Sequence, residues 1–165
     1  MNYCRIILDG LAMAAVFNLF VALLWIAIPV AFASMLPNEI KKASPIRDKR
    51  EVNFLRVALL SLYAGVFSWM IISAYQAQIT GFWNMFWTAY IEMFFVNLGD
   101  LIGLDWIFKD RFKDKIMIPG TEQCKAWNNS EWMRTLGLPE HLLAWPFIVC
   151  PLVGLLCAGI GTLMR

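Results

Sequence analysis

Four long apolar segments constrain the fold of this chain more than any other feature. They cover residues 10–36, 55–79, 82–108 and 142–164. Each contains the roughly 20 mainly apolar residues that an α-helix needs to cross about 30 Å of hydrocarbon. A helix also satisfies its own backbone hydrogen bonds in lipid, where no water is present. The segments therefore predict an all-α fold, with one transmembrane domain over residues 1–165 that forms an integral membrane four-helix bundle.

The composition supports the same class of protein. Hydrophobic residues make up 60% of the chain and charged residues 16%, and the mean hydropathy is +0.61. Soluble domains are usually about 45–50% apolar and about 25% charged. The excess of apolar residues indicates that the lipid bilayer is the main partner of this chain.

The basic residues indicate how the bundle is oriented. Eleven of the fourteen Lys and Arg residues lie in the two loops 37–54 and 109–141 or at their edges. Two spans joined by a tight turn at residues 78–81 separate these loops, so both loops lie on one side. The positive-inside rule places them in the cytoplasm and both termini outside. We therefore expect a multi-pass protein of a bacterial inner membrane. Topology explains the net charge of +2, and no nucleic-acid partner is expected.

Small residues repeat at helical spacing in two of the spans. Gly99 and Gly103 form a GxxxG pair, and Gly154 lies on a stripe of small residues in the last span. Such stripes let helix backbones approach closely in lipid. Either they only hold the bundle together, or one of them joins two copies of the chain in a homo-oligomer.

Two aspartates, Asp100 and Asp105, fall inside the apolar segment 82–108. An ionised carboxylate at the bilayer centre costs about 2.5–3.5 kcal/mol on insertion scales, so such residues face the bundle and find a partner. Arg56, at the inner end of segment 55–79, is the expected partner of Asp100, and Asn97 shares a helix face with Asp100. A functional site is the default interpretation at this depth. A structural Asp100–Arg56 pair is the alternative.

Two further polar groups are expected at the same cytoplasmic mouth. Glu122 follows a Pro119-Gly120 turn in the second loop, and His141 begins the last span. Carboxylates and an imidazole together suit a divalent cation of the Mg, Mn or Zn type. The predicted metal ligands are Asp100, Asp105, Glu122 and His141. The same groups would equally suit a cationic ligand or a proton relay.

Several short motifs together resemble a family of small four-span bacterial membrane proteins. The family shows a Pro-x-Glu-Ile element, an Asn-Leu-x-Asp stretch followed by Asp-Trp, a Pro-Gly-Thr-Glu element, and a histidine near the start of the last span. The matching residues are Pro37, Glu39, Ile40, Asn97, Leu98, Asp100, Asp105, Trp106, Pro119, Gly120, Thr121, Glu122 and, by position, His141. The resemblance covers roughly residues 36–145. It implies a topology and a candidate site, but no reaction.

Three classes of function follow from these observations. The first is a membrane protein that binds a cation or small polar ligand at the acidic site, in connection with transport. The second is a metal-dependent enzyme that acts on lipid head groups, with Lys109, Arg111 and Lys113 binding phosphate. The third is a structural or accessory membrane subunit. The chain has no phosphate-loop, zinc-protease or haem-attachment motif, and its single histidine excludes a two-histidine metal site within one chain.

Overall fold

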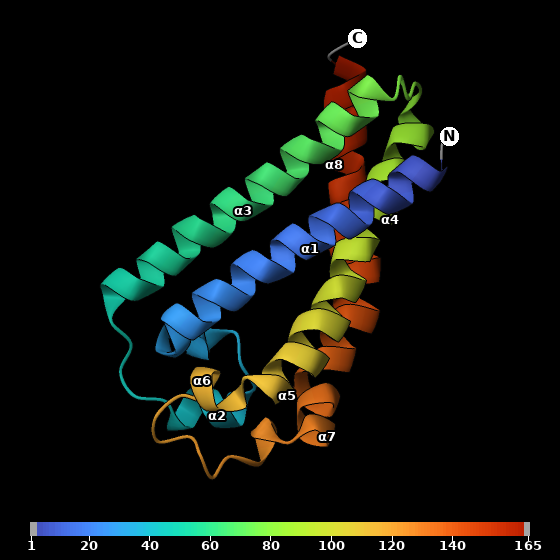
Figure 1. The fold of residues 1–165 in the computed structure, drawn as a ribbon. Coiled ribbons are helices and arrows are strands. Elements are labelled where there is room, and N and C mark those ends of the chain that lie inside the picture. Colours follow the sequence, from blue (N-terminus) through green and yellow to red (C-terminus); the bar gives the residue numbers. More distant parts are fainter. Residues whose placement is uncertain (1–2, 164–165) are drawn as a thin grey trace.

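The computed structural model describes residues 3–163 and is all-α (Figure 1). The chain is 85% helical, and no strand occurs in the described range. This confirms the all-α part of the predicted fold.

Four long helical stretches make up the bundle. Their bounds are α1 (Tyr3–Ala27), α3 (Lys49–Gln76), α4 (Phe82–Gly99) with the π-helical η2 (Asp100–Phe108) and α5 (Lys109–Arg111), and a final stretch of 35 residues, Asn129–Leu163. The final stretch contains α7 (Asn129–Trp132), the π-helical η4 (Met133–Gly137) and η5 (Glu140–Val149), and α8 (Cys150–Leu163). Shorter elements are η1 (Pro29–Ser34), α2 (Asn38–Ala43), α6 (Lys113–Ile116) and η3 (Lys125–Trp127).

Three helices are long and apolar enough to cross a membrane, which indicates a multi-pass membrane protein. They are Tyr3–Ala27, Lys49–Gln76 and Asn129–Leu163. The helix over the third predicted span, Phe82–Gly99, is not among them, and it carries the polar residues Glu92 and Asn97. Both of these side chains are buried, and α4 packs against α1 and α8. This helix is therefore enclosed largely by protein.

The ends of two predicted spans differ from those observed. The first helix ends at Ala27 and does not reach residue 36, because Ile28 leaves the helical region (φ −138°, ψ 59°) directly before Pro29. A residue before proline is disfavoured in the α conformation. The last helical stretch begins at Asn129, well before residue 142. Much of the predicted second loop is thus helical.

The long helices place both predicted loops at one end of the bundle. Figure 1 shows α2, α5, α6 and α7 gathered at this end, which we call the loop end. The turn between α3 and α4 lies at the opposite end, near the start of α1 and the end of α8. A hydrogen bond of 3.1 Å from Arg5 Nη2 to Gln76 Oε1 joins α1 to α3 there.

The glycine stripes are used inside the bundle. A Cβ atom on Gly99 would lie 2.7 Å from Asn18 Nδ2 and 2.9 Å from Ala14 Cβ, both in α1. A Cβ atom on Gly154 would lie 2.9 Å from the Phe86 ring in α4. These close approaches agree with the first of the two predicted roles, which is packing between helices of one chain.

Candidate functional site

A buried histidine joins the final helical stretch to α4 and η2. His141, in the first turn of η5, is 2% exposed. Its Nδ1 lies 2.7 Å from Asn97 Oδ1, and its Nε2 lies 3.2 Å from Asp105 Oδ2. Asn97 Nδ2 donates in return to the His141 backbone carbonyl at 3.0 Å. Asn97 and Asp105, which the sequence placed in one candidate site with His141, thus both contact His141 directly.

The hydrogen bonds fix how many protons this network holds. The Asn97 amide nitrogen donates to the His141 carbonyl, so the Asn97 oxygen faces the imidazole as an acceptor. His141 Nδ1 must then carry a proton. The Nε2–Oδ2 contact to Asp105 needs a second proton between its two atoms. The His141–Asp105 pair is therefore neutral overall, which reduces the cost of burying it.

The π-helical turn in η2 explains why Asn97 and Asp105 reach one imidazole. In a regular α-helix, residues eight positions apart differ by about 80° around the axis. Residues 100–108 are π-helical, a local geometry that is frequent at functional sites. The wider turn changes the register between Asn97 and Asp105, so both side chains contact His141. A sequence analysis that assumes regular α-helical spacing misses this contact.

A cavity of about 130 Å³ lies beside this network. Asp100, Asp105, Glu140 and His141 are the ionisable groups of its lining, apart from Tyr63. Trp145 Nε1 donates to Glu140 Oε1 at 3.4 Å. The sequence analysis did not identify Glu140, although its position beside His141 at the start of an apolar segment is a signal that could have found it.

Aromatic rings form much of the cavity wall. The aromatic lining residues are Phe17, Trp25, Phe32, Tyr63, Trp132 and Trp145. The Trp25 ring stacks on Phe32 at a centroid distance of 5.7 Å and on Trp132 at 5.9 Å. Trp145 stacks on the His141 imidazole at 6.1 Å. The sequence analysis missed this wall, because its rings come from α1, η1, α3, α7 and η5.

Two indole groups of this wall lack hydrogen-bond partners within residues 3–163. The Nε1 atoms of Trp25 and Trp132 are buried and unpaired in that range. A buried donor without a partner costs about 1–3 kcal/mol, so each such group in a folded protein calls for an explanation. Both indoles line the cavity, where water could accept their hydrogen bonds.

Glu122 and Arg56, two of the predicted site residues, do not line the cavity. Glu122 is exposed, and its Oε1 accepts a hydrogen bond of 2.9 Å from the Gly120 N–H. This hydrogen bond lowers the pKa of the Glu122 carboxyl. The Pro119-Gly120 turn does form, with a φ of +87° at Gly120, but it holds Glu122 locally. Arg56 is exposed, and no ion pair joins it to Asp100 among the described residues.

The predicted metal ligands are not assembled as a set. Within residues 3–163, no group of three or more His, Cys, Asp or Glu side chains is placed to hold a metal ion. Of the four predicted ligands, Asp100, Asp105 and His141 line the cavity, whereas Glu122 closes its own turn. The structure therefore gives no support to a divalent metal at this position.

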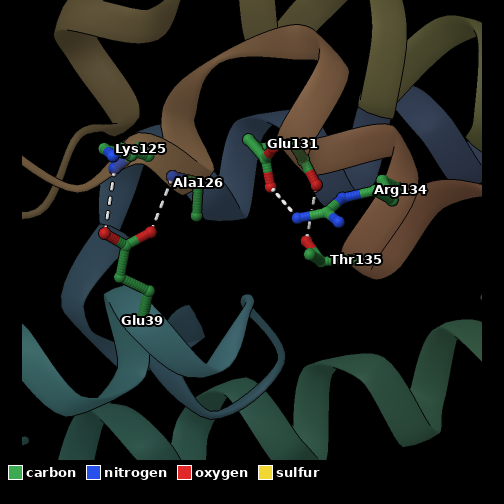
Figure 2. Close-up of polar contacts among 6 residues, drawn as sticks. All are labelled: Glu39, Lys125, Ala126, Glu131, Arg134 and Thr135. Carbon is green, nitrogen blue, oxygen red and sulfur yellow. Dashed lines mark hydrogen bonds and ion pairs between the residues drawn. The ribbon is translucent and has the colours of Figure 1, made fainter.

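Glu39 joins the two loops at the loop end. Its Oε1 and Oε2 accept hydrogen bonds from the backbone N–H groups of Lys125 and Ala126, at 3.0 and 2.8 Å (Figure 2). The neighbouring Ile40 is fully buried. In the second loop, Thr121 Oγ1 accepts a hydrogen bond of 3.0 Å from Trp127 Nε1. Of the residues in the family resemblance, Glu39 thus connects the two loops, and Thr121 holds the second loop together.

Comparisons with protein families, with curated proteins and with solved structures found no match to this chain. The resemblance to small four-span bacterial membrane proteins therefore stays a prediction, which rests on the motifs quoted above.

Proposed function

We propose that this chain is a multi-pass membrane protein that binds a small organic cation in the cavity at its loop end. The observation that carries this proposal is the lining of the cavity. It combines the carboxylates Asp100, Asp105 and Glu140 with six aromatic rings, and no lysine or arginine is among its described members.

The charges of the lining support a ligand that is itself positive. Asp105 and His141 form a neutral pair, as their hydrogen bonds require. Asp100 and Glu140 have no such basic partner in the cavity lining. A carboxylate in an apolar environment either stays protonated or is matched by a positive charge. A cation from outside the chain would match both groups.

The aromatic rings support an organic cation over a metal ion. An ammonium group within about 6 Å of an aromatic ring is attracted by about 0.5–2 kcal/mol, and aromatic cages that bind quaternary ammonium groups use this attraction. Calcium and magnesium instead require about six oxygen ligands. The cavity offers three carboxylate groups and extensive ring surface, which favours the organic ligand.

The position of the cavity supports access from the cytoplasm. It lies next to α7 and η1, at the end of the bundle that carries both basic loops. By the positive-inside rule these loops face the cytoplasm. We propose that the helix over residues 82–108 completes a four-span bundle in a bacterial inner membrane. The ligand would enter from the cytoplasmic side.

No observation favours the two alternative functions over ligand binding. The enzyme hypothesis uses Lys109 to bind phosphate, but this side chain is fully buried, and its Nζ donates to the Trp127 carbonyl at 3.3 Å. The hypothesis of a purely structural subunit predicted an Asp100–Arg56 pair in place of a cavity. Asp100 instead lines the cavity, and Arg56 is exposed.

Thermal unfolding of the detergent-purified protein tests the proposal. A ligand that binds only the folded state stabilises it by RT ln(1 + [L]/Kd). We expect tetramethylammonium chloride to raise the unfolding midpoint more than sodium chloride or magnesium chloride at equal ionic strength. The Asp100→Asn and Glu140→Gln variants should lose this shift, whereas Asp114→Asn, an exposed position in α6, should retain it. Equal shifts for all three salts in the wild type would contradict the proposal.

A further inference from the structure

An apolar groove of about 320 Å³ lies along α3, on the side that faces α4 and α8. Tyr63 and Ala64 line it from α3, Met93 from α4, and Leu156 from α8. The Tyr63 hydroxyl is the one side-chain polar group among its described lining residues. Two of the helices that border it, Lys49–Gln76 and Asn129–Leu163, are long and apolar enough to span a membrane. In a bilayer, hydrocarbon is therefore the natural content of this groove.

The groove and the acidic cavity meet at Tyr63. This residue lines both of them, and it is 39% exposed. Its ring also lies 5.5 Å from the Phe17 ring, which belongs to the cavity wall. The acidic cavity and the apolar groove are thus adjacent, and Tyr63 forms part of the lining of both.

The dimensions of the groove suit an extended aliphatic chain. Its α3 lining extends from Leu60 to Met70, which corresponds to about 15 Å at 1.5 Å per residue. A second groove of about 350 Å³ lies on the other side of α3, lined by Ser61 and Gly65 among others. This second groove shares no lining residue with the cavity, so only the first groove adjoins the acidic groups.

We infer that the ligand is a cationic amphiphile, with its amine or quaternary ammonium head in the acidic cavity and its aliphatic chain in the groove between α3, α4 and α8. This inference rests on the proposed function, because it uses the same cavity for the head. It adds the substrate class, which is an amphiphile whose aliphatic chain lies among the long apolar helices. The apolar lining of the groove and the acidic lining of the cavity match the two parts of such a molecule.

The test compares decyltrimethylammonium with tetramethylammonium in micelles of an uncharged maltoside detergent. The readout is the affinity obtained from the concentration dependence of the unfolding midpoint. Burial of each CH₂ group away from water contributes about 0.8 kcal/mol, and 1.4 kcal/mol is tenfold in affinity. If the groove buries only about two CH₂ groups more completely than the micelle does, the decyl compound should therefore bind roughly ten times more tightly than tetramethylammonium. Partition of the decyl compound into micelles is the same for all variants, so comparisons between variants cancel it.

Two substitutions on α3 test the groove that adjoins the cavity independently of the second groove. Ala64→Trp fills the groove that adjoins the cavity, and Ser61→Trp places the same side chain in the second groove. In the Ala64→Trp variant, we expect decyltrimethylammonium to bind no more tightly than tetramethylammonium. This variant should still bind tetramethylammonium as the wild type does. Ser61→Trp should behave as the wild type does. From α8, Leu156→Trp should repeat the effect of Ala64→Trp, with the exposed Leu155→Trp as its control.

The possible outcomes distinguish this inference from the proposed function. If the decyl advantage survives in both groove variants, the chain does not lie in the groove and the inference is wrong, although the cation site stands. If tetramethylammonium binding is lost in both groove variants, the ammonium head does not bind in the cavity independently of the groove, and the inference is wrong. If neither compound stabilises the wild type, both the inference and the proposed function fail.

Discussion

The imidazole of His141 lies between two acceptors from one neighbouring helical stretch. Its Nδ1 is 2.7 Å from Oδ1 of Asn97, and its Nε2 is 3.2 Å from Oδ2 of Asp105. All three residues are buried. The network holds η5 against α4 and η2 and so positions one wall of the cavity.

The first prediction concerns Asn97. Asn97→Ala removes the acceptor of His141 Nδ1 and the donor to the His141 carbonyl. Leaving buried polar groups unpaired costs about 1–3 kcal/mol. We expect a loss of this size in the free energy of unfolding in detergent. Asn53→Ala, at an exposed position of α3, serves as the control, and equal effects of the two substitutions would contradict the role of Asn97.

The second prediction concerns the coupling of His141 to Asp105. His141→Phe keeps a ring against Trp145 but leaves the buried Asp105 without its partner, which should cost about 3–5 kcal/mol. His141→Phe, Asp105→Asn and the double variant together form a double-mutant cycle. Residues in one hydrogen-bond network show coupling energies of about 0.5–3 kcal/mol. Strictly additive losses would show that the two side chains do not interact.

The third prediction compares two glycines within long helices, Gly99 in α4 and Gly65 in α3. Gly99→Val should destabilise the protein by about 1–3 kcal/mol, because its side chain would meet Ala14 and Asn18 of α1. Gly65→Ala meets nothing within 4 Å, so it should stabilise α3 by about 0.5–1 kcal/mol. Thermal unfolding of both variants tests whether the two changes in stability have opposite signs. A neutral Gly99→Val would contradict close packing of α1 and α4.

The fourth prediction compares the two carboxylates in Figure 2. Glu39→Ala removes both hydrogen bonds that join α2 to the backbone of η3. We expect trypsin to cleave the second loop after Lys125 several-fold faster in this variant. Glu131→Ala removes only an exposed pair with Arg134, and such pairs contribute about 0–1 kcal/mol. Equal cleavage rates in the two variants would show that Glu39 does not fasten the loops.

The fifth prediction concerns the pH dependence of the Pro119-Gly120 turn. The hydrogen bond from the Gly120 N–H lowers the pKa of Glu122. A carboxyl whose pKa is depressed in the folded state adds stability above its unfolded pKa, and this contribution is lost as the pH falls through the folded pKa. A carbon-13 NMR titration of Glu122 should therefore give a midpoint below that of an unstructured glutamate. A midpoint at or above that value would contradict the bond.

The helices could be predicted from the sequence, but some of their ends could not. Runs of apolar residues longer than a bilayer crossing leave few alternatives to a helix. The end of the first helix depends on Pro29, which stops it at Ala27. The early start of the last helix, at Asn129, could not be read from hydropathy, because residues 129–141 are largely polar and their helix is held by packing.

The candidate site could be predicted only in part, for reasons of local geometry. Asp100 and Asp105 could be predicted as site residues, because a buried charge in an apolar segment is costly. Asn97 and His141 could be predicted as their neighbours, because the sequence places them at a similar depth in the membrane. The π-helical register of η2, which brings Asn97 and Asp105 to one imidazole, has no signature in the apolar pattern. The aromatic wall joins residues as distant as Trp25 and Trp132. Only tertiary packing places them together.

Equilibrium dialysis of the purified protein against labelled tetramethylammonium tests the central claim most directly, because it measures binding to the folded chain without unfolding it. The account predicts one saturable site per chain in the wild type and in Asp114→Asn, and loss of that site in Asp100→Asn and Glu140→Gln. Absence of saturable binding in the wild type, or unchanged binding in both cavity variants, would contradict it.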